Sequence, residues 1–255
     1  MKTWIGYLAV AVLLSSPPRS LAGTVILSGD LNIVSGIAAN GFGVHPNNNG
    51  TFFANILGAG TTVRVFGTQP VSGLTPLNNF YQTIPGVSSS TITGPITSAN
   101  LAIVDLLIVI LPAKSFSASE TLALTAFAQS KGTLFLLGEH NRLNPNGNKR
   151  INTLLGALGS SMRIVSSYDE SGAWVARRTN GQIVTNPLTK GVNRFVYGGN
   201  AISRVSGGKA LFYQRDGVTP IIAFQVVPEP SIVGLLSLAV VFGVFRRRVG
   251  NTRHQ

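Results

Sequence analysis

Four short apolar runs divide the middle of the chain. They cover Thr24 to Leu27, Thr62 to Phe66, Val104 to Leu111 and Thr133 to Leu137. A run of four to eight apolar residues that ends in a turn signal is typical of a strand buried on both faces of a sheet. We therefore expect these segments to form the centre of a parallel sheet.

Segments whose apolar residues have helical spacing lie between the predicted strands. One helix is predicted from about Gly50 to Leu57 and ends at Gly58 or Gly60, because glycine commonly terminates a helix. A second, capped by Ser117 or Ser119, continues to Gln129. A third covers Lys149 to Leu158 and places its leucines and Ile151 on one face.

The remaining segments complete an α/β pattern. Strands are expected around Phe195, at Leu211 to Tyr213 and at Ile221 to Phe224. Residues 68–100 are rich in Ser, Thr, Gly, Pro and Asn without a clear period, so they are expected to form a long loop or a small excursion. The alternation of strands and helices predicts a mostly parallel open sheet with helices on both faces.

The first 22 residues have the composition of an export signal. Lys2 precedes an apolar run from Trp4 to Leu14, and Ser20-Leu21-Ala22 places small side chains where signal peptidase reads them. The apolar run has about 11 residues, whereas spanning a bilayer takes roughly 20. We expect cleavage after Ala22, although an uncleaved anchor is the alternative.

Three features follow one another at the other end of the chain. Pro228-Glu229-Pro230 comes first, an apolar run from Ile232 to Phe245 follows, and Arg246, Arg247 and Arg248 come last. The prolines prevent a helix from continuing out of the domain and leave an extended peptide that a protease can bind. The arginines hold the far end of the apolar run on the cytoplasmic side.

This arrangement resembles the PEP-CTERM sorting tail of Gram-negative bacteria. The resemblance implies that an exosortase recognises Pro228-Glu229-Pro230, removes the tail and passes the protein toward the cell surface or extracellular matrix. The protein would then be anchored in the inner membrane at least transiently. A plain membrane anchor preceded by an accidental Pro-Glu-Pro is the alternative.

The middle of the chain resembles a second family. Asp105 to Pro112, Phe116 to Glu120, Lys131 to Glu139 and Asn186 to Val192 are similar to segments of the class I glutamine amidotransferase-like fold, which is related to the flavodoxin-like fold. Active members of that family use a cysteine nucleophile. This chain contains no cysteine, so amidotransferase activity and disulfides are excluded.

The net charge of +12 has to be located before it suggests a partner. Six of the 20 cationic residues and one of the 8 anionic residues, Glu229, lie in the two terminal segments, which leaves 14 cationic against 7 anionic residues between them. These cations are scattered and form no basic stripe interleaved with aromatic residues. We therefore predict no nucleic-acid partner.

Polar residues at the strand ends are the candidates for chemistry. Asp30 follows the first predicted strand, Pro112 the third, and Glu139-His140-Asn141 the fourth. Ligands of open α/β sheets bind beyond the carboxyl ends of the strands, so Asp30, Glu139 and His140 could form an acid–base site with His45 on a nearby loop. The alternative is that these residues only cap helices and bind loops.

Other chemistries have little support. The chain contains no G-x-S-x-G nucleophile elbow and no H-E-x-x-H zinc motif, so we predict no serine hydrolase, no tightly held metal and no cofactor. The run Asn47-Asn48-Asn49 could bind sugar hydroxyls through its amides, although such runs are commonly turns.

These observations predict four segments. They are a signal peptide (1–22), an amidotransferase-like α/β domain (23–226), a sorting tail (227–248) and a short cytoplasmic end (249–255). The predicted function is that of a non-enzymatic exported protein whose partners are signal peptidase, an exosortase and exopolysaccharide or envelope proteins. A hydrolase-like enzyme using Asp30, Glu139 and His140 and a carbohydrate-binding envelope module remain alternatives.

Overall fold

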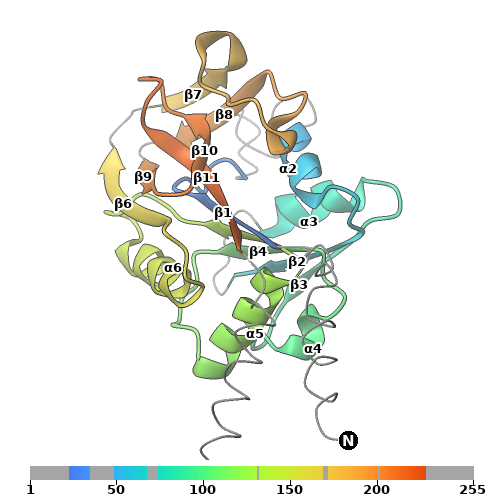
Figure 1. Cartoon of the computed structure of the whole chain (residues 1–255). Coiled ribbons are helices and arrows are strands. Elements are labelled where there is room, and N and C mark those ends of the chain that lie inside the picture. Colours follow the sequence, from blue (N-terminus) through green and yellow to red (C-terminus); the bar gives the residue numbers. More distant parts are fainter. Residues whose placement is uncertain are drawn as a thin grey trace, which may run out of the picture.

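A computed structural model describes residues 23–34, 49–67, 74–130, 132–168, 172–199 and 202–227 (Figure 1). The predicted leader ending at Ala22, the loop residues His45, Asn47 and Asn48, and the tail from Pro228 onward lie outside the described residues. Within the described ranges, no helix combines the length and the hydropathy of a membrane span.

A seven-stranded sheet forms the centre of the described structure, in the order β10-β11-β1-β5-β4-β2-β3. Strands β1, β5, β4, β2 and β3 run parallel to one another, whereas β11 is antiparallel to both of its neighbours, β1 and β10. The prediction of a mostly parallel α/β sheet is confirmed. The strands are β1 (Gly23–Ser28), β2 (Thr62–Phe66), β3 (Ser88–Ile92), β4 (Leu106–Ile110), β5 (Thr133–Leu137), β10 (Lys209–Tyr213) and β11 (Pro220–Val227).

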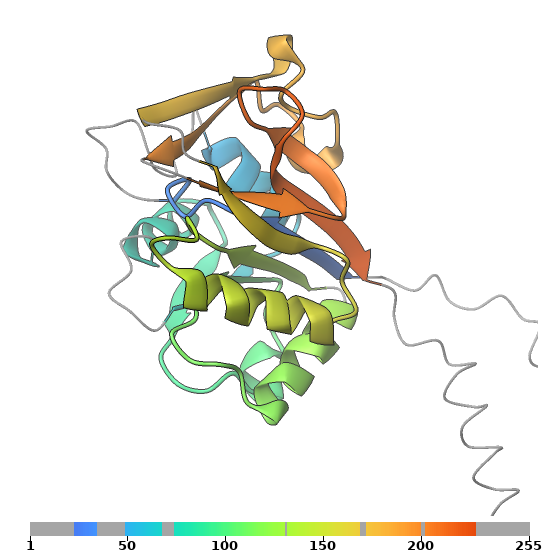
Figure 2. The ribbon, with the colours of Figure 1, turned by 90° about the vertical axis from the view of Figure 1, so that its left-hand side faces the viewer.

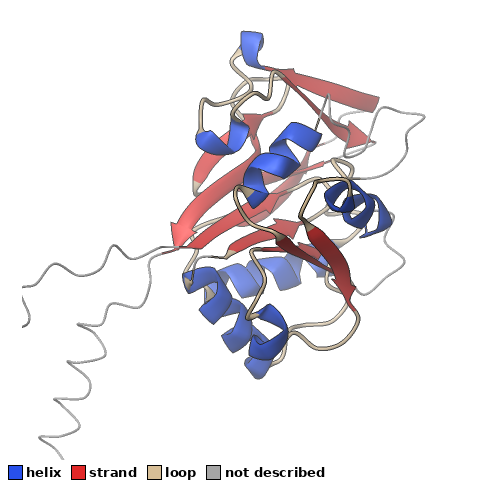
Figure 3. Cartoon of the chain, turned by 90° about the vertical axis from the view of Figure 1, so that its right-hand side faces the viewer, coloured by secondary structure: helices blue, strands red, loops and turns tan. Residues whose placement is uncertain are grey.

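Helices cover both faces of the sheet, as Figure 3 shows. On one face, α2 (Gly50–Leu57) and α3 (Leu74–Gln82) contribute to one hydrophobic core with alternate residues of the strands. On the other face, α4 (Ser98–Leu101), α5 (Ala118–Gln129) and α6 (Pro145–Ala157) bury a second core. Strand β4 is apolar at every position, and β5 at every position after Thr133, because side chains that alternate in direction meet helices on both sides.

Two smaller antiparallel sheets lie beside the central sheet (Figure 2). One pairs β6 (Arg163–Tyr168) with β9 (Ile202–Ser206), and the other pairs β7 (Gly172–Arg177) with β8 (Arg194–Gly199). Two short 3-10 turns, η3 (Arg178–Asn180) and η4 (Pro187–Thr189), lie in the connection from β7 to β8. Strands β6, β7 and β9 were not among the predicted elements.

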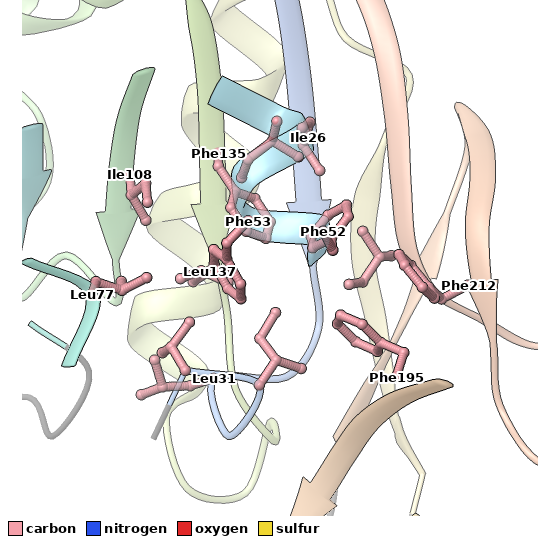
Figure 4. Packing of buried hydrophobic residues seen from close by; sticks show 14 of the residues in the cluster. Ile26, Leu31, Phe52, Phe53, Leu77, Ile108, Phe135, Leu137, Phe195 and Phe212 are labelled. Carbon is pink, nitrogen blue, oxygen red and sulfur yellow. The ribbon is translucent and has the colours of Figure 1, made fainter. Parts of the chain in front are cut away.

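Aromatic packing joins α2 to the strands that surround it. The ring of Phe52 meets those of Phe135, Phe195 and Phe212 edge-on, at centroid distances of 5.9, 5.5 and 5.0 Å. Figure 4 shows Phe52 and Phe53 between the central strands and the side of the molecule that carries Phe195 and Phe212. Helix α2 therefore connects the central sheet to the β7–β8 pair.

Of the two expectations for residues 68–100, a long loop or a small excursion from the sheet, the long loop was wrong. The described part of this stretch, from Leu74 onward, contains α3, β3 and most of α4. In α3 only Leu77 and Tyr81, four positions apart, are buried, so the apolar period is too short to recognise. Strand β3 lies at the edge of the sheet, where serine side chains can face solvent.

Helix α6 begins earlier than predicted. It starts at Pro145 rather than Lys149, because the side chain of Asn144 accepts a hydrogen bond from the backbone N–H of Gly147 and a proline suits the first turn. The predicted N-cap at Ser117 is confirmed, since Ser117 and Glu120 form a capping box on α5.

Candidate functional site

The carboxyl ends of β1 and β5 bring Asp30 and Glu139 to one edge of the sheet. The two strands are parallel neighbours, with Ser28 opposite Leu137 in the register. The ladder continues one step further, where the N–H of Gly138 donates to the carbonyl of Ser28 over 2.9 Å. Asp30 lies two residues after Ser28, and Glu139 lies two residues after Leu137.

The carboxylate of Asp30 is fully buried and bound by backbone donors. Its Oδ1 accepts the N–H of Asn32 over 2.8 Å, and its Oδ2 accepts the N–H of Gly198 in β8. Burial raises the pKa of Asp30 to about 6, although these hydrogen bonds lower it in part. The side chain thus joins the end of β1 to the β7–β8 pair.

Glu139 is the second buried carboxyl, with 8% of the residue exposed. Its Oε1 accepts the backbone N–H of His140 over 2.7 Å. Burial and, to a smaller extent, the negative charge of Asp30 raise the pKa of Glu139 to about 8. At neutral pH the pair therefore holds a proton that two exposed carboxyls would lose, and the two groups titrate jointly.

The imidazole of His140 is held by its own loop. The residue is 3% exposed, and its Nδ1 accepts the backbone N–H of Arg142 over 3.3 Å. A nitrogen that accepts carries no proton, so the neutral ring has its hydrogen on Nε2. The hydrogen bond between Glu139 and His140 uses the backbone N–H of the histidine rather than its ring.

Asn148 and Ser203 belong to the same network, and the sequence analysis missed both. The amide of Asn148 accepts from the N–H of Glu139 over 3.1 Å and donates to the carbonyl of Glu139 over 2.6 Å. The hydroxyl of Ser203 donates to that same carbonyl over 2.9 Å. A signal existed for Asn148, because it lies on the apolar face of α6, three positions before Ile151.

Two glycines allow the backbone to pass close to this network. A Cβ on Gly29 would lie 2.0 Å from the carbonyl oxygen of Ser203. A Cβ on Gly138 would lie 2.3 Å from Cδ1 of Ile164 and 2.7 Å from Oδ1 of Asn148. Neither position accepts a larger residue without a shift of the backbone or of a neighbouring side chain.

The third predicted strand end, at Pro112, lies on the same edge of the sheet. The N–H of Leu111 donates to the carbonyl of Leu137 over 3.1 Å, so β4 and β5 end side by side. Leu111 has a φ of 37°, an unfavourable conformation for a residue with a branched side chain. The guanidinium of Arg150 donates to the carbonyl of Pro112 over 2.9 Å and supports this turn.

Asn49, from the predicted sugar-binding run, has a different role. Its amide is fully buried, donates to the carbonyls of Ile33 and Val196, and accepts the N–H of Val196 over 2.8 Å. The two bonds to Val196 attach the start of α2 to β8, and the bond to Ile33 attaches it to the segment after β1. The side chain of Asn49 is therefore occupied within the protein and does not face a ligand.

The arrangement of Asp30 and Glu139 can in principle store and transfer a proton near neutral pH. Three of the oxygens that would act, both of Asp30 and Oε1 of Glu139, accept hydrogen bonds from the backbone. Among the described residues, no group of three or more potential ligands is placed to hold a metal ion. The hydrogen bonds of Asp30 and Glu139 connect the strand ends to α6, β8 and β9. This arrangement fits a structural role better than a reactive one.

Comparisons with known proteins leave the family open. No family model and no curated protein matches the chain. Two chains among the solved structures match, and one of them is described as "mmIFT52 N-terminal domain". It is 18% identical, covers 58% of this chain and 76% of its own, and has a TM-score of 0.44. A likeness of that extent carries no argument about what this chain does.

Proposed function

We propose that this chain is a non-enzymatic exported protein that an exosortase sorts to the cell surface or the extracellular polymer. Its leader up to Ala22 directs export, and Pro228-Glu229-Pro230, the apolar run and the arginines form the sorting signal. The inner-membrane anchor would be transient. The domain between the two signals is the part delivered.

One observation carries the non-enzymatic part of this proposal. Both oxygens of the Asp30 carboxylate accept backbone N–H groups, from Asn32 and from Gly198, and the side chain is fully buried. A general base needs an accessible oxygen within reach of the proton that it removes. Here the carboxylate instead links β1 to β8, which is the role of a structural residue.

The domain is best assigned to the class I glutamine amidotransferase-like variety of α/β fold. Support comes from five parallel strands with helices on both faces and from the sequence segments that resemble that family. The absence of cysteine from the chain removes the nucleophile that active members use. We therefore propose that the domain has the fold of this family but not its amidotransferase activity.

The sorting proposal is tested by intact mass and cell fractionation in the native host. The wild-type protein is compared with a variant in which Pro228, Glu229 and Pro230 are alanine. We expect a wild-type product that lacks both ends and lies outside the inner membrane, and a variant that keeps its tail in the membrane. A control with Asn251→Ala and Thr252→Ala should behave as wild type. Two proteins that both keep the tail would show a simple anchor.

A hydrolase-like enzyme is the second candidate, and the raised pKa of Glu139 favours it. A carboxyl whose pKa is raised to about 8, beside one whose pKa is about 6, has the pattern of an acid–base pair. Such an enzyme would turn over nitrophenyl esters or glycosides with a bell-shaped pH profile, and Glu139→Gln would abolish turnover. Turnover that persists in this variant, or is absent in both proteins, would reject the candidate.

A further inference from the structure

A cleft of about 630 Å³ lies at the carboxyl ends of β2 and β3, away from the Asp30–Glu139 network. The chain runs from β2 outward to the edge strand β3 and then returns to β4 on the other side of β2. In open α/β sheets this change of direction leaves a crevice where ligands bind. Part of the lining is formed by Phe66, Thr93, Gly94, Lys114, Phe116 and Glu120.

One wall of the cleft is aromatic. The rings of Phe66 and Phe116 lie 6.1 Å apart between their centroids, at an angle of 39°. Phe66 is almost fully buried at the end of β2, whereas Phe116 is half-buried and lies on the loop before α5. Phe116 therefore leaves part of an apolar surface open to the cleft, and a ring-shaped ligand can pack against such a surface.

Glu120 holds the loops around the cleft together, and its carboxylate is already engaged in hydrogen bonds within the protein. Its carboxylate accepts the N–H of Ile96 over 3.1 Å and both the N–H and the hydroxyl of Ser117 over 2.9 Å. Partial burial raises the pKa of Glu120, but these donors outweigh it, and the pKa lies below its usual value. The negative charge is thus held by the loops on both sides of the cleft.

Lys114 supplies the available charge. It is exposed at the cleft and has no ion-pair partner among the described residues. The segment between the two terminal signals has 14 cationic and 7 anionic residues, so the field of the domain also favours an anion. The start of α5 is already capped by Ser117 and adds no binding group of its own.

Hydroxyls and open space complete the lining. Thr93 and Ser115 expose their side chains at the cleft, and Thr91 lies beside them half-buried. A Cβ built on Gly94 would meet no atom within 4 Å, so the space in front of this residue is empty. The cleft therefore combines an apolar face, hydroxyl groups and one cation.

We propose that this cleft binds an acidic sugar unit, with its carboxylate at Lys114, its hydroxyls at Thr93 and Ser115, and its ring face against Phe116. A pyranose ring has apolar C–H faces and a rim of hydroxyls, and a uronic acid adds one carboxylate, so each group meets a matching part of the lining. Asn49 is not part of the lining, and the proposal does not depend on removal of the sorting tail.

The test is a ligand-observed NMR titration of the full-length protein in a mild detergent. The probes are glucuronate, glucose and benzoate, which separate the contributions of the acid and the hydroxyl-bearing ring. The protein should bind glucuronate, a single sugar unit, with a dissociation constant of the order of 1 mM. Glucose should bind about five-fold more weakly, because it lacks the charge that Lys114 attracts. Benzoate should also bind more weakly, because it lacks the hydroxyls.

Two variants test the location of the site independently. Lys114→Gln should weaken glucuronate about five-fold and leave glucose unchanged. Gly94→Leu should weaken both sugars more than ten-fold, because its side chain enters the cleft, and it should fold normally because its Cβ meets nothing. Lys209→Gln, at an exposed position on the opposite edge of the sheet, is the charge control and should bind as wild type.

Several results would overturn the proposal. One is that no glucuronate binds at a concentration 20-fold above the expected dissociation constant. Another is that glucose binds as tightly as glucuronate, or that benzoate binds at least as tightly. The last is that glucuronate binding is unchanged in both Lys114→Gln and Gly94→Leu. Thermal melts of each variant separate loss of the site from loss of the fold. The sorting experiment is read out by mass and location, so either proposal can fail without the other.

Discussion

The carboxylate of Asp30 lies close enough to Glu139 for its negative charge to add to the effect of burial on the pKa of Glu139, which reaches about 8. Two adjacent parallel strands produce this pairing, since Asp30 and Glu139 each lie two residues after Ser28 and Leu137, the last pair in the register of β1 and β5. The pairing joins the central sheet to β8 and makes the stability of the fold depend on pH.

The first prediction concerns that pH dependence. The folded state binds a proton more tightly at Glu139 than the unfolded chain does, because the pKa rises from 4.5 to about 8. The contribution to stability is therefore fully present below pH 4.5 and decreases as the pH rises toward 8. Glu139→Gln keeps an oxygen that can accept from His140 and should be more stable than wild type by about 2 kcal/mol at pH 8.5, with little difference at pH 5.

Urea denaturation at several pH values measures this effect. Glu120→Gln is a control of opposite sign, because the pKa of Glu120 is lowered in the folded state. Glu120 is only partly buried, so its loss should reduce stability at neutral pH by only a few tenths of a kcal/mol. If Glu139→Gln destabilises the protein equally at both pH values, Glu139 is not protonated in the folded state.

A second prediction tests the aromatic core around α2. Phe52 is fully buried and its ring contacts those of Phe53, Phe135, Phe195 and Phe212. Phe52→Ala should lower the free energy of unfolding by about 3–5 kcal/mol, because it removes buried surface and leaves a cavity. Leu122→Ala, at a residue 71% exposed on α5, should change it by less than about 0.5 kcal/mol. Equal losses would show that α2 does not pack as described.

The third prediction concerns the buried amide of Asn49. Asn49→Ala leaves the N–H and the carbonyl of Val196 and the carbonyl of Ile33 without this partner. Unfolding measurements should show a loss of about 2–3 kcal/mol. Asn180→Ala, at an exposed position in η3, should be neutral. A neutral Asn49→Ala would instead return Asn49 to the list of ligand-binding candidates.

A fourth prediction compares two glycines with ordinary backbone angles. Gly29→Ala places a methyl group 2.0 Å from the carbonyl oxygen of Ser203, so β1 and β9 must separate. We expect a loss of at least about 3 kcal/mol or failure to fold. Gly94→Ala meets no atom within 4 Å and should be neutral. Circular dichroism and thermal melts compare the two variants, and a stable Gly29→Ala would contradict the close approach.

The central strands could be predicted because their signal is local. Leu106 to Ile110 and Thr133 to Leu137 are apolar at successive positions, and the turn residues after them are read directly from the chain. The N-cap at Ser117 is also local, since its partner Glu120 is three residues away. Strand β3 was missed because an edge strand buries only part of its surface and tolerates serine.

The candidate site was predictable in part. Its position at the ends of β1 and β5 follows from the rule that polar residues after parallel strands share one edge. Ser203 contacts Glu139 from 64 positions away, and Gly198 contacts Asp30 from 168 positions away, so no local pattern indicates either partner. Those partners determine whether a carboxylate faces a ligand or supports the fold.

The sequence by itself determined the α/β class and the lack of a cysteine nucleophile, and it led to the proposals of export and sorting. Composition, the order of segments and the hydrophobic period can all be read from the chain without its tertiary structure. The tertiary structure alone decided that the Asp30 carboxylate is bound within the protein, that burial raises the pKa of Glu139 and that a cleft opens beside Lys114. Burial and long-range hydrogen bonds set these properties, and they arise only when distant segments pack together.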